Sequence, residues 1–288
     1  MSESTLKNKW VMITGASSGF GAAAARAFGA EGSKLLLGAR RVDRLKAVAA
    51  EAGRAGAPEA HFHTLDVSQT PSVEAFLAWA RETITEHQSS VTSHQSLLTD
   101  HRSPITPPVS PLPRLDVLIN NAGGAHGLDT VAAGKDEDWE AMLQSNTLGI
   151  LRMTRAALPL MLDNPGSTLI NIGSVAGHVA YEGGAAYCAA KAGELQITRA
   201  LRLELNGTGI RVTTVDPGLA ETEFSVVRFK GDAARAKKVY EGTRPLTAAD
   251  IADILVWVAS RPAHVNIDEL LVKPVDQAAV HKVHRRTT

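Results

Sequence analysis

The stretch from residue 10 to residue 30 limits the fold of this chain more than any other. A short apolar run, Trp10–Ile13, precedes a glycine-rich turn with the spacing Gly-x3-Gly-x-Gly, and the alanine-rich segment Ala22–Ala30 follows. Strand, turn and helix in this order are typical of a nucleotide-binding loop. Glycines let the backbone approach a pyrophosphate, and the new helix offers free N–H groups and its positive dipole end. The stretch therefore predicts an α/β protein that binds a nucleotide.

The next two apolar runs indicate which nucleotide is bound. Lys34–Ala39 predicts a strand, and Arg40 and Arg41 follow it. An acidic residue at this place binds the adenosine ribose of NAD, whereas arginines receive the 2′-phosphate of NADP. The two arginines favour NADP, although solvated arginines at a helix start would give the same pattern. Asp66 ends a third strand, over 61–67, where it can accept a hydrogen bond from the adenine amino group.

Three polar residues in the middle of the chain predict the chemistry. Ser174 follows an apolar run over 167–173, so its hydroxyl is expected at the carboxyl edge of the sheet, where open α/β proteins bind ligands. Tyr187 and Lys191 stand four residues apart in an alanine-rich stretch that predicts a helix, so both project from one face. An ammonium beside a phenol favours the phenolate. Together these groups suit protonation of a carbonyl oxygen during hydride transfer, although such a pair alone is usually a surface pair.

The rest of the chain continues the alternation of strands and helices. Further strands are expected at 115–120, 210–216 and 265–272, and helices at 42–52, 71–83, 138–146, 147–162 and 248–260. The segment 219–245 is long and rich in charge.

Composition excludes several classes of protein. The 288 residues carry a formal net charge of zero and no apolar run long enough to cross a bilayer, so neither a nucleic-acid binder nor a membrane protein is expected. A single cysteine, Cys188, rules out an internal disulfide. The polar start, Met1–Lys9, lacks an apolar signal region, so a cytoplasmic protein is expected.

Residues 87–107 repeat a seven-residue unit three times, and each unit begins with a histidine, at His87, His94 and His101. No acidic or cysteine ligand accompanies these histidines at a recognised spacing, and prolines from Pro104 onward end any helix. One apolar residue in seven is too few for a coiled coil. We therefore expect no metal site, and interpret about 84–113 as a low-complexity surface insertion in a single domain that spans 1–288.

Five motifs at these spacings resemble the short-chain dehydrogenase/reductase family. They are Thr14-Gly15-x3-Gly19-x-Gly21, Asn120-Asn121-Ala122-Gly123, Ser174, Tyr187-x3-Lys191 and Pro217-Gly218. The resemblance covers about residues 9–274 without the insertion. It implies one catalytic domain with a three-layer, doubly wound Rossmann-like α/β fold, in which a seven-stranded parallel sheet has helices on both faces. It also implies a homo-oligomer, either a dimer or a tetramer.

The resemblance assigns roles to residues at matching positions. Tyr187 is implied to donate and accept the proton, Ser174 to orient the substrate carbonyl, and Lys191 to tune Tyr187 and hold the nicotinamide ribose. Asn146 is implied to complete a water-linked proton relay to the lysine. The residues expected to contact NADP are Thr14, Gly15, Ser17, Ser18, Gly19, Phe20, Gly21, Arg40, Arg41, Asp66, Val67, Asn121, Ala122, Gly123, Tyr187, Lys191, Pro217, Gly218, Thr222 and Phe224.

A narrower resemblance points to NADP-dependent 3-hydroxy acid dehydrogenases, which oxidise serine, allo-threonine and related short acids. The segments that carry it are Tyr181-Glu-Gly-Gly184, Thr222-Glu-Phe-Ser225, Val227–Asp232 and His264-Val-Asn-Ile267. It implies that Ser174, Tyr187 and Glu182 contact the substrate. Arg228 is a candidate partner for the substrate carboxylate, since arginine binds carboxylates through two hydrogen bonds. A surface charge is an equally good interpretation of Arg228.

Two features depart from the narrower pattern. The loop 217–222 is one residue shorter than expected and carries Ala220-Glu221 where small residues are usual, and the insertion has no counterpart. Two other functions therefore stay open: a broad-specificity NADPH-dependent carbonyl reductase, and a nucleotide-binding regulator without turnover. The complete set of Ser174, Tyr187, Lys191 and Asn146 argues against the regulator.

Overall fold

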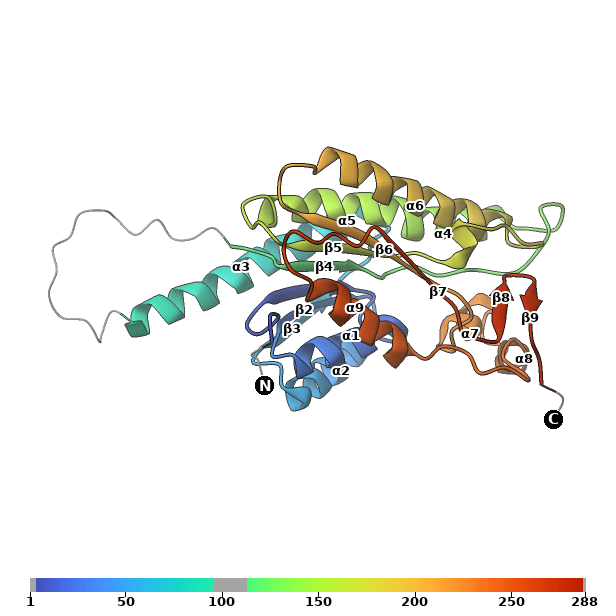
Figure 1. The fold of residues 1–288 in the computed structure, drawn as a ribbon, viewed down its shortest axis with the longest axis horizontal. Helices are drawn as coiled ribbons and strands as arrows, with labels where there is room; N and C mark the ends of the chain where they lie inside the picture. The colour runs from blue at the N-terminus through green and yellow to red at the C-terminus, as the bar shows by residue number, and fades with distance from the viewer. Residues whose placement is uncertain (1–3, 96–112, 287–288) are drawn as a thin grey trace, which may run out of the picture.

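A seven-stranded parallel sheet forms the centre of the computed structural model, which describes residues 4–95 and 113–286 (Figure 1). Its strands are β1 (Trp10–Thr14), β2 (Lys34–Ala39), β3 (Ala60–Thr64), β4 (Val117–Asn120), β5 (Thr168–Ile172), β6 (Arg211–Pro217) and β7 (Glu269–Val272). They lie in the order β3-β2-β1-β4-β5-β6-β7, and each pair of neighbours is parallel. The strand order reverses between β1 and β4, which is where open α/β sheets bind ligands.

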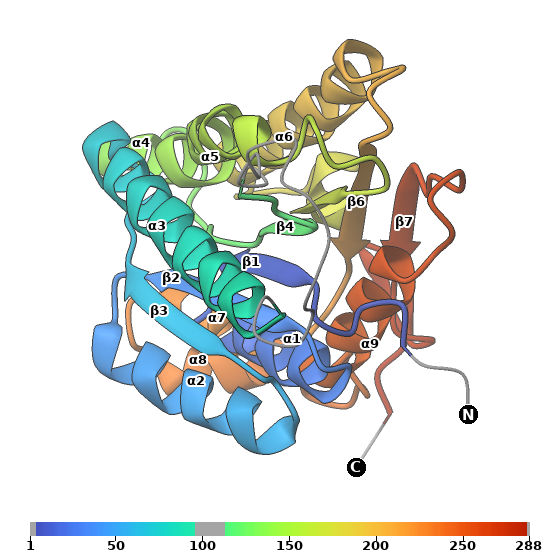
Figure 2. The ribbon, with the colours of Figure 1, turned by 90° about the vertical axis from the view of Figure 1, so that its left-hand side faces the viewer.

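Helices cover both faces of the sheet (Figure 2). They are α1 (Gly19–Ala30), α2 (Val42–Ala55), α3 (Thr70–Gln95), α4 (Asp136–Leu143), α5 (Gly149–Ala157), α6 (Ala185–Glu204), α7 (Phe224–Arg228), α8 (Ala233–Lys238) and α9 (Ala248–Ala259). Helices α1, α2 and α9 lie on one face, and α3 to α6 lie on the other. The predicted three-layer, doubly wound fold is confirmed.

The two faces of the sheet bury separate cores because side chains alternate along each strand. In β1, Val11 and Ile13 belong to the core under α1, α2 and α9, whereas Trp10 and Met12 belong to the core under α3 and α5. All five residues of β1 are buried. Strands covered on both faces read as continuous apolar runs, which is why the sequence revealed them.

The helix expected at 71–83 is longer than predicted. Helix α3 continues to Gln95, about three turns beyond Thr83 and into the repeat. No proline or glycine occurs between Thr83 and Pro104, so nothing in the sequence stops the helix there. The first part of the expected insertion is therefore helical. Residues 96–112 lie outside the described residues, and the prediction of a surface excursion there stays a prediction.

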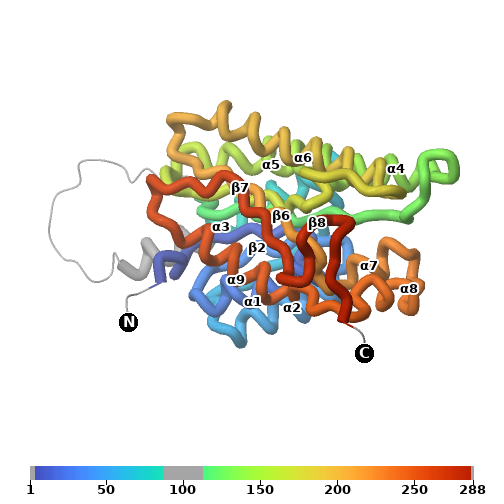
Figure 3. Tube along the Cα trace, turned by 45° about the vertical axis from the view of Figure 1, so that its right-hand side comes forward, coloured from blue at the N-terminus to red at the C-terminus, as the bar shows by residue number. Residues whose placement is uncertain are grey.

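In two segments the observed helices differ in their bounds from the predicted ones. The helices expected at 138–146 and 147–162 are α4 and α5, joined by a π-helical turn over 144–148 that contains Asn146. The charged segment 219–245 holds the short helices α7 and α8. A hairpin of β8 (Gln277–Ala279) and β9 (Lys282–Val283) lies at the same end of the molecule (Figure 3). No helix in the described parts of the chain is long and apolar enough to cross a membrane.

Candidate active site

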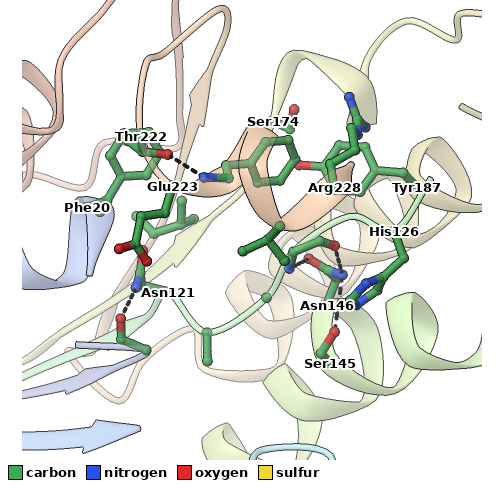
Figure 4. A pocket seen from close by; sticks show the side chains of 18 of the residues that line it. Phe20, Asn121, His126, Ser145, Asn146, Ser174, Tyr187, Thr222, Glu223 and Arg228 are labelled. Carbon is green, nitrogen blue, oxygen red and sulfur yellow. Dashed lines mark hydrogen bonds between the residues drawn. The ribbon is translucent and has the colours of Figure 1, made fainter. Parts of the chain in front are cut away.

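A cleft of about 840 Å³ opens at the carboxyl ends of the strands. Its walls come from the turn between β1 and α1 and from the segments after β2, β3, β4 and β5. The first turns of α6 and the helix α7 also line the cleft. In Figure 4, Phe20, Asn121, Thr222 and Glu223 lie toward one end of this cleft, and Ser174, Tyr187, Asn146 and Arg228 lie toward the other. Most of the residues predicted for the cofactor, and all four predicted for the chemistry, thus line one cleft.

The turn between β1 and α1 is shaped for close backbone contact. Gly15 and Gly19 have φ angles of 65° and 53°, a region that favours glycine. A Cβ atom on Gly15 would lie 2.9 Å from the Cα atom of Ala122. Ser18, the residue before α1, makes no side-chain cap to the helix. The first N–H groups of α1 are therefore not satisfied by the Ser18 side chain, and they suit an anionic phosphate.

Arg41 lies against the same turn. Its Nε donates to Ser17 Oγ at 3.3 Å, and its Nη2 donates to Ser18 Oγ at 2.6 Å. Its Nη1 contacts Glu223 at 3.1 Å, and Arg44 contacts the other oxygen of Glu223. Partial burial raises the pKa of Glu223, but hydrogen bonds from Arg44 and Arg41 outweigh it and bring the pKa below its usual value. Two arginines and one carboxylate therefore leave a net positive charge beside the turn between β1 and α1.

Two predicted cofactor residues do not line the cleft. Thr14 is buried, and its hydroxyl accepts hydrogen bonds from the backbone N–H groups of Asn121 and Ala122 at 2.9 Å. A Cβ atom on Gly21 would lie 2.6 Å from Asn121 Nδ2, so Gly21 leaves room for that side chain. Asn121 Nδ2 donates to Thr14 O at 2.9 Å. Thr14 and Gly21 therefore position the segment after β4 against the turn between β1 and α1, without lining the cleft themselves.

The remaining predicted cofactor residues line the cleft. Asp66 and Val67 follow β3, and Asp66 Oδ1 accepts hydrogen bonds from the N–H and the hydroxyl of Ser68 at 3.0 and 2.7 Å. The structure also brings into the lining Gly15, Ser17, Ser18, Gly19, Phe20, Arg40, Arg41, Asn121, Ala122, Gly123, Pro217, Gly218, Thr222 and Phe224.

Ser174, Tyr187 and Lys191 meet in the cleft, as predicted. Ser174 follows β5 and begins a 3₁₀ turn over 175–177, where its Oγ accepts from the N–H of Ala176 at 3.1 Å. Tyr187 stands in the first turn of α6 and is largely buried, and Lys191 lies one turn later. The Ser174 hydroxyl hydrogen is left to donate to a ligand, because the oxygen is the atom that Ala176 uses.

Lys191 is held in a buried position. Its Nζ donates to Ile172 O at 2.6 Å and contacts Glu194 Oε2 at 3.3 Å. Burial lowers the pKa of Lys191, but the nearby Glu194 and Tyr187 favour the charged form and raise the pKa overall. The lysine therefore stays an ammonium beneath the phenol.

Asn146 lies in the π-helical turn and is buried. Its Nδ2 donates to Gly124 O and Met142 O at 2.8 Å, and its Oδ1 accepts from the N–H of Gly124 at 3.1 Å. The side chain thus ties the loop after β4 to α4, and it also lines the cleft.

Arg228, on α7, lies among aromatic rings at the catalytic end. Its guanidinium carbon is 5.0 Å from the ring centre of Tyr187 and 5.1 Å from that of Phe224. Its Nη2 donates to the hydroxyl of Tyr181 at 2.6 Å. Its buried Nε has no hydrogen-bond partner among the described residues. Arg228 therefore places a guanidinium with one unused donor beside Tyr187.

The predicted contact of Glu182 with the substrate does not agree with the structure. Glu182 is exposed and does not line the cleft, whereas the preceding residue, Tyr181, does. Gly183 has a φ of 74°, and this turn brings Tyr181 inward and leaves Glu182 in solvent. Burial raises the pKa of Tyr181, which Arg228 opposes in part.

Sequence reasoning also missed His126, which lines the cleft after β4. Burial lowers its pKa, and the opposing effect of Asp138 does not cancel this. The available signal was its position six residues beyond Asn120, the last residue of a strand, where a sheet of this class binds ligands.

Comparisons with known proteins agree with this geometry. The family model described as short chain dehydrogenase matches residues 9–88 and 106–232. An NADP-dependent 3-hydroxy acid dehydrogenase YdfG from Salmonella typhi is 40% identical over 277 residues, covering 96% of this chain and 99% of that protein. A sulfoacetaldehyde reductase from Chromohalobacter salexigens is 39% identical over 269 residues, covering 93% and 94%.

A solved structure has the same fold. The closed form of a serine dehydrogenase in complex with NADP⁺ superposes with a TM-score of 0.79 at 37% identity. The match covers 96% of this chain and all of that chain.

Proposed function

Because the chain belongs to the short-chain dehydrogenase family, and is thus an oxidoreductase acting on CH–OH groups, we propose that it interconverts a short 3-hydroxy acid and its 3-oxo acid with NADP. The observation that carries this proposal is Arg228, an arginine with an unused buried donor beside Tyr187. Relatives whose names specify 3-hydroxy acids and NADP, and one named for an aldehyde with a sulfonate group, support it.

The residues around the cleft fit NADP. Gly15 and Gly19 provide the close backbone approach that a pyrophosphate needs, and Ser17, Ser18 and Arg41 converge where a 2′-phosphate can be bound. When bound, the cofactor would take up or supply the hydride through its nicotinamide. The chain itself has to hold the substrate, move the proton and exclude water.

Ser174 and Tyr187 handle the substrate oxygen in this proposal. The Ser174 hydroxyl donates a hydrogen bond to it, because the serine oxygen is already fixed by the N–H of Ala176. Tyr187 takes the hydroxyl proton during oxidation and returns it during reduction. The positive charge of Lys191, held by Ile172 O, stabilises the phenolate between these steps. Asn146 completes a proton relay to Lys191 through water.

Arg228 selects the substrate in this proposal. A carboxylate can receive hydrogen bonds from two guanidinium nitrogens, and the Nε of Arg228 is free to make one of them. The rings of Tyr187 and Phe224 hold the guanidinium in place through cation–π contacts. An acid bound there has its hydroxyl carbon a short distance away, near Tyr187, as a 3-hydroxy acid requires.

Replacing Arg228 tests the substrate class. In Arg228→Ala we expect KM for L-serine to rise about thirtyfold, since a charge-assisted hydrogen bond contributes about 2 kcal/mol. KM for NADP⁺ and turnover of a simple secondary alcohol should change little. Arg235→Ala is the matched control, because Arg235 stacks on Phe229 nearby and does not line the cleft.

An unchanged KM for the acid in Arg228→Ala would reject this role. Turnover of bulky neutral ketones in preference to short acids would favour the broad carbonyl reductase instead. Cofactor binding without turnover, in the native protein and in Tyr187→Phe alike, would favour the regulator.

A further inference from the structure

An ion pair lies at the end of the segment that carries Arg228. Lys230 follows the last residue of α7 by two positions, and its Nζ contacts Asp138 Oδ2 at 2.7 Å. Asp138 belongs to the first turn of α4, a helix that also contributes to the lining of the cleft. The side chain of Asp138 is 15% exposed and that of Lys230 is 55% exposed. The pair thus joins the segment after α7 to α4.

The backbone at Lys230 is one that lysine rarely adopts. Its φ is 53°, in the left-handed region, where a side chain costs energy that glycine avoids. Among the described residues, Asn8 is the only other non-glycine residue with a positive φ, and asparagine tolerates this region better. A lysine kept at such a position indicates that its side chain has a role, and the contact with Asp138 is the one that the structure shows.

The position of Lys230 is tied to that of Arg228 through the backbone. Lys230 N–H donates to Val227 O at 3.0 Å, so the turn after α7 is closed. Arg228 itself is held from the segment after β4, because Gly127 N–H donates to Arg228 O at 2.9 Å. An ammonium fixed at Asp138 therefore limits where α7, and with it the Arg228 guanidinium beside Tyr187 (Figure 4), can lie.

Lys230 also lies among other carboxylates. A hydrogen bond to Asp138 raises the pKa of Lys230 against a smaller effect of desolvation, and the charges of Asp138, Asp129 and Glu137 add to the rise. Lys230 could thus affect an anionic substrate in two ways, which differ in sign. If it only offset these carboxylates, removal of the Asp138 charge would strengthen the binding of an acid. If the pair positions Arg228, removal of either partner weakens that binding.

We propose that Lys230 and Asp138 are positioning residues that hold Arg228 where it binds the substrate carboxylate. The inference rests on the proposed function and extends it, because Arg228 is the group that selects the acid there. Neither Lys230 nor Asp138 lines the cleft. The pair therefore acts through the short chain between Arg228 and Lys230 and not by contact with substrate or cofactor.

Breaking the pair from each side tests the proposal. For Lys230→Met and for Asp138→Asn we expect KM for L-serine to rise about fivefold, the upper end of what a partly exposed ion pair contributes. The kcat, KM for NADP⁺ and the thermal midpoint should change little. Lys9→Met is the matched control, because Lys9 pairs with Asp116 at 3.0 Å with side chains 48% and 17% exposed, outside the cleft. It should behave as the native protein.

A second arm of the experiment removes Arg228 first. When Lys230→Met is added to Arg228→Ala, KM for L-serine should rise no further, because the pair acts only through Arg228. A rise of the same size in both backgrounds would overturn the proposal, since it would show an effect of Lys230 that is independent of Arg228.

Two more results would reject the positioning role. One is a KM for L-serine within about twofold of the native value in either Lys230→Met or Asp138→Asn. The other is a lower KM in Asp138→Asn, which is the sign expected if the charges alone matter. In each case a raised KM in Arg228→Ala would leave the proposed function standing. An unchanged KM in Arg228→Ala would reject the proposed role of Arg228 and this inference with it.

Discussion

Arg41 is the residue whose removal should change cofactor choice most. It reaches the turn between β1 and α1 with donors to Ser17 and Ser18, the place where the 2′-phosphate of NADP is expected. NAD has a hydroxyl there and gains little from a guanidinium. We therefore expect Arg41→Ala to weaken NADP⁺ binding while NAD⁺ binding stays nearly the same.

The size of this effect follows from the contacts. A hydrogen bond to a charged group contributes about 1.5–3 kcal/mol, and the Arg41 side chain is 44% exposed, so solvent screening favours the lower part of this range. A loss of about 2 kcal/mol corresponds to a rise of about thirtyfold in KM for NADP⁺. Glu223 also favours the lower part of this range, because it competes with the phosphate for Arg41 and Arg44 in the free protein.

The assay is the initial rate of oxidation of one hydroxy acid, followed by the absorbance of the reduced nicotinamide at varied NADP⁺ or NAD⁺. Arg54→Ala is the matched control, since Arg54 is exposed at the other end of α2 and outside the cleft. The difference between Arg41→Ala and the native protein should shrink at high salt. Equal losses with both cofactors, or no loss with NADP⁺, would refute the assignment of Arg41 to the 2′-phosphate.

Two further predictions concern stability. Arg211 is buried in β6 and donates to Ala259 O at 2.7 Å and to Arg261 O at 3.0 Å. Arg211→Met should therefore lower the free energy of unfolding, measured by urea titration, by about 3 kcal/mol. A loss below about 1 kcal/mol would contradict this. Asp250 accepts from the N–H of Thr247 at 2.7 Å, and the backbone and hydroxyl of Thr247 lower its pKa. A lowered carboxyl pKa stabilises the fold above the unfolded value and loses this effect as the pH falls through the folded value. Because this carboxylate is exposed and screened by solvent, Asp250→Asn should cost only about 0.5 kcal/mol at neutral pH and almost nothing in strong acid, and a cost that grew on acidification would be the opposite result.

Strands and the principal site residues could be predicted from the sequence for a physical reason. A parallel sheet buried on both faces leaves continuous apolar runs, and polar residues directly after such runs, such as Ser174, have to lie at its carboxyl edge. The spacing of Tyr187 and Lys191 on one helix fixed their common direction. The cytoplasmic location and the homo-oligomer are not tested by the structure and stay predictions.

Other features depend on tertiary contacts that local patterns do not contain. The π-helical turn around Asn146 leaves no mark in hydrophobic periodicity, so it was interpreted as a boundary between two helices. The direction of Glu182 is set by the turn at Gly183. Glu194 stands three residues after Lys191, so its contact with the lysine was open to prediction, but its links to Thr214 and Asp216 come from a strand that follows later in the chain.

The most direct test of the account is substrate turnover by the purified protein with NADP⁺. L-Serine, L-allo-threonine and 3-hydroxyisobutyrate would be compared with a simple secondary alcohol, and the reduced cofactor measured by its absorbance. The account predicts reduction of NADP⁺ with the acids and far slower reduction with the alcohol, because only the acids engage Arg228. Turnover of the alcohol alone, or equal rates with and without a carboxylate, would contradict it.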